Sequence, residues 1–112
     1  MSAQTARTAS TDAELDTAVD VLRLLADRTR LAILALLRDG ELSVGAIADR
    51  LARPVPGVSQ HLARLRTGRL VATRRDGVTV YYRLANEHIA ALVLNVLHQA
   101  EHLRYDAPPH HL

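Results

Sequence analysis

One short segment constrains the fold of this chain more than any other. Residues 70–84 read as two β-strand patterns, LVATRR and VTVYYRL, around Asp76-Gly77, the dipeptide that signals a tight hairpin most strongly. Elsewhere the apolar residues recur every three or four positions, which is the spacing of helices that bury one face. The sequence therefore predicts a mainly α (α+β) fold with five helices and a single β-hairpin.

Capping residues and helix breakers predict where the helices begin and end. Thr11 and Glu14 form a capping box, which starts the first helix, at about residues 12–26. Pro54 and Pro56 fit only a turn or a first helical turn, so a new helix follows them. The second helix is expected between Asp27 and Asp39-Gly40, the third from Ser43 to Leu51, the fourth from the prolines to Gly68, and the last, capped by Asn86, over 87–104.

The chain is expected to form one domain with two short ends. Residues 1–10 are small and polar and should be a disordered arm. Residues 11–104 are expected to be a winged helix-turn-helix domain for DNA binding and dimerisation, because two short helices joined by a tight turn precede a basic hairpin. The first and last helices carry more apolar surface than a small core uses, which predicts a homodimer. Residues 105–112 are a histidine-containing tail.

Charge is distributed very unevenly, although the net charge is only +2. Residues 50–83 contain eight arginines and one aspartate, whereas residues 1–49 sum to −3 and residues 84–112 to −2. Five of the six histidines follow residue 84. The basic block favours a polyanion such as double-stranded DNA, and the histidine-rich block favours a cation.

The predicted DNA-reading residues lie on the fourth helix and on the hairpin, which forms the wing. Glutamine can bond adenine and arginine can bond guanine through paired hydrogen bonds, and serine serves bases or phosphates. Adjacent strand residues point to opposite faces, so only one of two neighbouring wing arginines faces the duplex squarely. The predicted operator contacts are Ser59, Gln60, His61 and Arg64 on the helix, and Arg74, Arg75 and Thr79 on the wing.

Several classes of protein are excluded. The chain has no cysteine, which rules out disulfides, thiolate metal sites and thiol catalysis. Ser59 and His61 are two positions apart on a helix and cannot form a catalytic pair, and no nucleophile elbow or phosphate loop occurs, so no enzyme is expected. The longest apolar run, Ile89 to Leu94, is too short to span a membrane, and the first ten residues lack a signal-peptide core. We expect a cytoplasmic protein without a membrane partner.

Two long segments carry a family resemblance. LADRTRLAILALLRDGELSVGAIADRL and VSQHLARLRTGRLVATRRDGVTVYYRL resemble the ArsR/SmtB metal-sensing transcriptional repressors, over roughly residues 20–104. Within that family, NEHIAAL, AEHL and the C-terminal HH are most similar to the nickel and cobalt sensors of the KmtR type. The resemblance implies a homodimer that represses while metal-free and leaves its operator when metal binds to the last helix.

The predicted metal ligands are four imidazoles and one carboxylate. His88 and His102 are about 21 Å apart along one helix, so they can share a metal only across a dimer whose two-fold axis passes near Asn95. The family's zinc sensors have Asp and His where this chain has Asn86 and Gln99, which disfavours a closed four-ligand zinc site. Five or six nitrogen and oxygen ligands favour octahedral Ni(II) or Co(II). The candidates are His88, Glu101, His102, His110 and His111.

Some alternatives stay open at this point. His98 lies one helical turn from His102 and competes as a ligand. Zn(II) is an alternative inducer. A winged-helix regulator that does not sense metal, and a small metal-buffering or protein-interaction module without DNA activity, are alternative functions. Metal titration tests the former and a gel shift with upstream DNA tests the latter.

Overall fold

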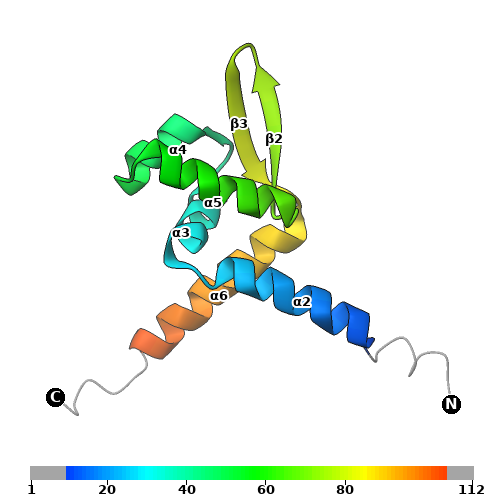
Figure 1. The fold of residues 1–112 in the computed structure, drawn as a ribbon. Coiled ribbons are helices and arrows are strands. Elements are labelled where there is room, and N and C mark those ends of the chain that lie inside the picture. Colours follow the sequence, from blue (N-terminus) through cyan, green and yellow to red (C-terminus); the bar gives the residue numbers. More distant parts are fainter. Residues whose placement is uncertain (1–9, 106–112) are drawn as a thin grey trace, which may run out of the picture.

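The computed structural model describes residues 10–105, and its elements follow the predicted order (Figure 1). The predictions of five helices and a hairpin are confirmed, with boundaries within about two residues. The predicted arm and tail lie almost wholly outside the described residues. The helices are α2 (Asp12–Leu25), α3 (Arg28–Leu37), α4 (Val44–Leu51), α5 (Val55–Thr67) and α6 (Glu87–Tyr105), and the strands are β1 (Leu42–Ser43), β2 (Val71–Asp76) and β3 (Thr79–Leu84).

Side-chain caps fix the starts of four helices, as predicted. The Glu14 N–H donates to Thr11 Oγ1 at 3.0 Å, and the Thr11 N–H donates to Glu14 Oε1 at 2.9 Å, which completes the capping box of α2. The side-chain oxygens of Asp27, Ser43 and Asn86 each accept a bond from the backbone N–H three positions on, at 2.9, 3.2 and 3.0 Å. These bonds satisfy donors that would otherwise have no partner within the helix.

The turn between α4 and α5 consists of backbone that cannot continue a helix. Ala52 ends α4 in the left-handed conformation, with φ of 53°. Pro54 is the extended N-cap of α5, and Pro56 lies in the first turn, where its missing N–H removes no helical hydrogen bond. The prolines therefore separate two helices of the helix-turn-helix and start the second one.

The sheet has one strand more than the sequence analysis predicted. β1 pairs antiparallel with β3, with Leu42 opposite Tyr82, and the strand order is β1-β3-β2. A two-residue strand is too short to produce an alternating pattern, so the sequence offered no signal for it. β1 attaches the segment after α3 to the middle of the hairpin.

The hairpin turn is shifted by one residue from its predicted position. Asp76 is the last residue of β2 and lies opposite Thr79, so the two turn residues are Gly77 and Val78 rather than Asp76 and Gly77. Gly77 has a φ of 62°, which glycine adopts without the steric cost of a side chain. Glycine at the first of the two turn positions suits the twist of a hairpin, and this preference determined the turn.

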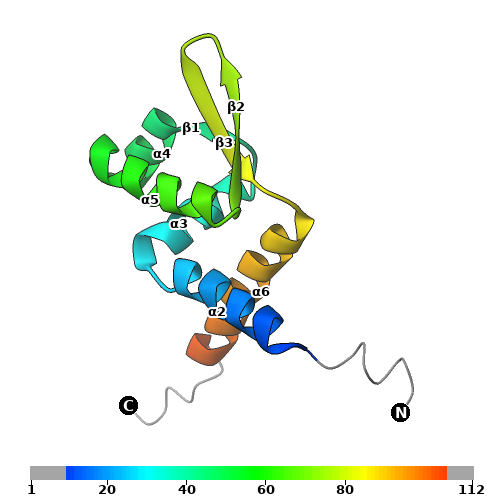
Figure 2. The same ribbon diagram turned by 45° about the vertical axis from the view of Figure 1, so that its right-hand side comes forward.

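One apolar core joins the elements, with α3 at its centre. Ile33 and Leu34 of α3 are 0% exposed, and Val93 of α6 is also 0% exposed. The buried residues of α4, α5 and the start of β2 complete the same cluster. In both views of the ribbon, α5 lies between the hairpin and α2, and the hairpin projects away from the helices (Figures 1 and 2). The second helix of the pair and the wing are therefore displayed beside one another.

Replacing Asp27 with alanine tests the cap of α3. The Arg30 N–H donates to the Asp27 carboxylate and holds the pKa of that carboxylate below its usual value. Ionised Asp27 therefore stabilises the fold fully above the pKa that it has in the unfolded chain. The stabilisation is lost as the pH falls through the lower pKa of the folded state. We expect Asp27→Ala to lower the free energy of unfolding by about 0.5–2 kcal/mol at neutral pH. In urea titrations the difference from wild type should shrink below about pH 4. An equal difference at both pH values would contradict this account.

Candidate DNA-binding surface and metal-ligand residues

α5 presents one face to the core and the opposite face outward. Ser59, Gln60 and Arg64, three of the predicted reading residues, are all exposed. The opposite face consists of apolar side chains that are at most 1% exposed, namely Val58, Leu62 and Leu65. α5 therefore has a polar face of the kind that enters the major groove. Contact of these three side chains with bases stays a prediction.

His61, the fourth residue predicted on this helix, lies differently. Its side chain is partly buried, and Nδ1 is 3.8 Å from Asp27 Oδ2 and 3.5 Å from a terminal guanidinium nitrogen of Arg30. Asp27 and Arg30 belong to the start of α3, so His61 connects α5 to α3. The predicted contact between His61 and DNA is the one that this geometry supports least.

The two wing arginines lie on opposite faces of the hairpin, as the strand period predicts. Arg74 is opposite Tyr81 and Arg75 is opposite Val80 in the β2–β3 register. Arg75 is exposed, and Thr79 is partly buried beside the turn. Of the predicted wing residues, Arg75 is therefore the cation best placed for a phosphate contact.

Arg74 is held by neighbouring side chains. Its Nε donates to both carboxylate oxygens of Glu41, at 3.0 and 3.2 Å, and a terminal nitrogen also bonds Glu41. Its guanidinium carbon is 4.7 Å from the centroid of the Tyr81 ring. The bonds from Arg74 lower the pKa of Glu41, as expected for a carboxylate paired with a guanidinium. Arg74 therefore joins the middle of the wing to Glu41, the residue before β1, and its contact with DNA stays a prediction.

The predicted metal ligands of α6 do not assemble a site within one chain. His88, Glu101 and His102 are all exposed, and within residues 10–105 no three or more His, Cys, Asp or Glu side chains form a group able to hold a metal. His110 and His111 lie outside the described residues. The donors themselves suit a borderline divalent ion, because they are imidazoles and a carboxylate on an accessible helix. A complete site on α6 would thus need further ligands, from residues 106–112 or from a second copy of the chain.

His98 lies beside two of the predicted ligands. His98, Glu101, His102 and Tyr105 border one shallow depression of about 350 Å³ on the last turns of α6. Positions three and four apart on a helix are neighbours, which explains this grouping. The proximity keeps His98 as an alternative ligand.

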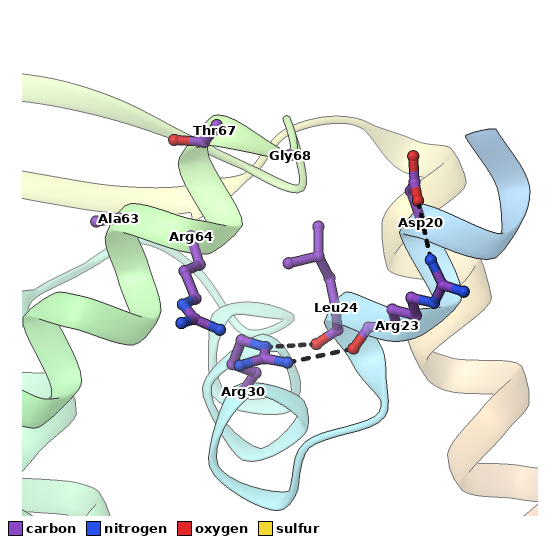
Figure 3. A pocket seen from close by; sticks show the side chains of 8 residues that line it. All are labelled: Asp20, Arg23, Leu24, Arg30, Ala63, Arg64, Thr67 and Gly68. Carbon is purple, nitrogen blue, oxygen red and sulfur yellow. Dashed lines mark hydrogen bonds and ion pairs between the residues drawn. The ribbon is translucent and has the colours of Figure 1, made fainter. Parts of the chain in front are cut away.

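A larger cleft of about 540 Å³ lies between the second half of α5 and the junction of α2 and α3 (Figure 3). Three arginines line it, Arg23, Arg30 and Arg64, and we call it the arginine cleft. The sequence does not predict this cleft, because its arginines come from three helices and share no spacing pattern. Of the three arginines, the sequence predicts only Arg64 as an operator contact.

Known proteins resemble this chain over most of its length. A helix-turn-helix domain model matches residues 25–74. The transcriptional regulator KmtR of Mycobacterium tuberculosis is 52% identical over 93 residues, covering 83% of this chain and 72% of KmtR. The transcriptional repressor SmtB of the same species is 42% identical over 86 residues, covering 77% of this chain and 64% of SmtB. The chain belongs to the ArsR/SmtB family.

A solved structure agrees with this assignment to the ArsR/SmtB family. The solution structure of Mb0332 from Mycobacterium bovis is described as a homodimeric winged helix-turn-helix DNA-binding domain of "a possible ArsR-family transcriptional regulator". It matches with a TM-score of 0.77 and 38% identity, covering 83% of this chain and 89% of that chain. The predicted winged helix-turn-helix fold and the predicted resemblance are confirmed.

Membership of the ArsR/SmtB family also settles the broad class of activity. The family consists of DNA-binding transcriptional regulators rather than enzymes, which agrees with the prediction from Ser59 and His61. Within the described residues 10–105, none of the helices is both long and apolar enough to cross a membrane.

Two substitutions separate base reading from phosphate binding on this surface. We expect Gln60→Ala to cost about 1–3 kcal/mol at one operator base pair and little at the others, because a glutamine amide distinguishes adenine. We expect Arg75→Ala to weaken binding to all sequences alike and to make the slope of log K against log salt less negative by about one unit per phosphate contact. Anisotropy titrations with single-base operator variants measure both, and equal affinity of the wild type for operator and scrambled DNA would contradict this surface.

Proposed function

We propose that this member of the ArsR/SmtB family is a homodimeric repressor that binds an inverted-repeat operator while metal-free and leaves it when Ni(II) or Co(II) binds at α6. The observation that carries the proposal is the combination of an exposed polar face on α5 with a basic wing beside it. Residues that could bind a divalent ion lie on a separate helix, so DNA and metal need not compete for the same side chains.

Exposed apolar residues on α2 support a dimer. Leu15, Val19 and Leu22 recur at helical spacing and are 53%, 42% and 54% exposed, although they are apolar. The sequence predicts a dimer from the apolar surfaces of both the first and the last helix. On the last helix, Leu92 and Val96 are partly buried and pack against the chain's own core. A second copy that covers α2 together with the outer side of α6 would remove this apolar surface from water.

The metal-ligand part of the proposal rests on the spacing along α6. An antiparallel pair of α6 helices with a two-fold axis near the exposed Asn95 would bring His88 of one copy beside His102 of the other. Glu101 adjoins His102 and adds a carboxylate, and His110 and His111 are the proposed remaining ligands. A bound Ni(II) or Co(II) ion would supply a cross-link between the two helices.

The packing of α6 offers a route from these ligands to α5. Val93 of α6 is fully buried in the same cluster as Ile33 and Leu34 of α3 and Leu62 of α5. A change in the angle of α6 within the dimer must therefore be accommodated by α3, which packs directly on α5. The distance between the two recognition helices then departs from the half-site spacing, and the free-energy coupling acts equally on metal affinity and DNA affinity.

Metal titration of the protein bound to its own upstream DNA tests this function. We expect Ni(II) and Co(II) to release the DNA, and His88→Ala or His102→Ala to abolish release while leaving metal-free binding unchanged, since neither lies on α5 or the wing. Fluorescence anisotropy of labelled DNA measures both. Release by Zn(II) alone would favour the zinc-responsive alternative, and binding that no metal alters would favour a regulator without metal sensing.

A shortened chain that ends before Pro108 tests the assignment of the metal. It lacks His110 and His111 and keeps His88, Glu101 and His102, a set of three ligands that with water suits tetrahedral Zn(II). We expect it to bind Zn(II) but to lose its response to Ni(II) and Co(II). The Co(II) absorption spectrum of the intact protein should show the weak d–d bands of five- or six-coordination. Intense tetrahedral bands that the truncation does not change would contradict the nickel and cobalt assignment.

The α2 surface can be tested without disturbing the core. We expect Leu22→Glu to give monomers with weak operator binding, because a charge on this surface opposes its burial in a dimer. The side chain is more than half exposed, so the variant should keep the helical content of the wild type in circular dichroism. Light scattering at micromolar concentration measures the mass, and a Leu22→Glu dimer would refute this interface.

A further inference from the structure

The arginine cleft carries a net positive charge, which favours binding of an anion. Its lining contains three guanidinium groups and one carboxylate, that of Asp20. Asp20 pairs with Arg23 at 3.7 Å, but both side chains are more than 70% exposed, so the pair neutralises little of the local charge. A net positive cleft in a protein that already presents a basic surface beside it is a site for a negatively charged group.

Arg30 is fixed in the wall of the cleft. Its Nε donates to the Leu24 carbonyl at 2.7 Å, and a terminal nitrogen donates to the Arg23 carbonyl at 3.2 Å. These are carbonyls of the last turn of α2, where the helix has no partners of its own for them. Arg30 therefore contributes a positive charge whose position does not change when a ligand arrives.

Arg64 extends from α5 toward Arg30 across the cleft (Figure 3). Within residues 10–105, no hydrogen bond or ion pair holds the side chain of Arg64, whereas its backbone carbonyl accepts a bond from the Gly68 N–H at 3.0 Å. Two guanidinium groups that converge from different helices repel one another, and an anion between them removes that repulsion and accepts hydrogen bonds from both. The fixed Arg30 and the unheld Arg64 side chain can thus bind one anionic group between them.

The cleft adjoins the proposed reading face of α5. Arg64 lies four positions after Gln60, and Thr67 lies seven positions after it. The cleft therefore starts about one helical turn, roughly 5 Å, beyond Gln60 on the same stripe. A helix about 10–12 Å across fills a major groove about 12 Å wide. Groups beside such a helix therefore meet the phosphates at the edge of the groove. In both ribbon views the wing lies on one side of α5 and α2 on the other (Figures 1 and 2).

We propose that the arginine cleft binds a backbone phosphate of the operator, with Arg64 and Arg23 donating to it beside the fixed charge of Arg30. The proposal rests on the proposed function as a DNA-binding repressor. It makes Arg64 a phosphate ligand rather than the reader of a guanine, and it adds Arg23 and Arg30 to the DNA-binding residues. The wing then holds one edge of the groove and the α2–α3 junction holds the other.

Salt dependence of operator binding by the full-length, metal-free dimer tests the cleft. Arg64→Gln and Arg23→Gln each remove one contact per protomer, and Arg104→Gln on the last turn of α6 is the control with the same change of charge. Because both arginines bind the same phosphate, we expect the double variant Arg64→Gln/Arg23→Gln to make the slope of log K against log salt less negative by about two units per dimer. Each single variant should give part of that change, and the control should leave the slope unchanged. Operator and scrambled DNA should lose affinity by the same factor. Circular dichroism and light scattering confirm that fold and dimer are kept.

A scan with uncharged methylphosphonates locates the contact. One substituted phosphate in each half-site should weaken wild-type binding, and it should weaken binding of Arg64→Gln by a smaller factor. The proposal is overturned if Arg64→Gln loses affinity at one base pair only, or if both cleft variants keep the wild-type slope. Titration with inorganic phosphate adds a separate outcome: saturable binding that Arg64→Gln abolishes without changing the slope would assign the cleft to a free anion. A wild type that binds no operator would refute the proposed function itself.

Discussion

The packing of α3 is the constraint on which the rest of the structure depends. α3 contacts α2, α4, α5, α6 and the wing strand β3, and its Ile33 and Leu34 are 0% exposed. Burial of large aliphatic side chains at such a centre contributes about 1.5–3 kcal/mol for each of them. Within residues 10–105, no other element contacts α5, which faces the proposed DNA, as well as both α2 and α6 to a similar extent. The positions of α5 and α6 are therefore not independent, although their proposed ligands are different.

Polar contacts where α2, α3 and α5 meet fix how these helices are oriented on the apolar core. Arg30 holds two carbonyls at the end of α2, while Asp27 caps α3 and lies near His61 of α5. Three helices thus meet through one guanidinium and one carboxylate at the edge of the arginine cleft. Leu24 packs so closely on Gly68 that a Cβ at Gly68 would lie 2.1 Å from a Leu24 methyl carbon. Backbone and side chains together hold α2 against the end of the recognition helix, which gives the cleft a defined shape.

Features that depend on residues close together in the sequence were predictable, whereas contacts between distant segments were not. Helix starts were predictable because Thr11, Ser43 and Asn86 act within three residues, and the hairpin because glycine permits the turn. The one-residue shift of the turn, the strand β1 and the brace between Arg74 and Glu41 depend on pairings across 30 or more residues, or on competition between two turn positions. His61 followed the helical pattern of α5, yet its partners come from α3. For the same reason the arginine cleft left no signature in the sequence.

The separation of the two proposed ligand surfaces limits how regulation can work. α6 has one fully buried residue, Val93, whereas its other apolar side chains in the core are only partly buried, so a change in its angle disturbs less packing than a movement of α3 would. Couplings between ligand sites are usually worth about 1–3 kcal/mol, or 5- to 150-fold in affinity. An adjustment of α6 against an intact α3 is compatible with a coupling of that size, whereas unpacking α3 would cost the whole fold. In the proposed dimer, regulation is therefore best served by reorienting each protomer around an unchanged core, so that the α5 surface and the arginine cleft move as one rigid unit relative to the operator.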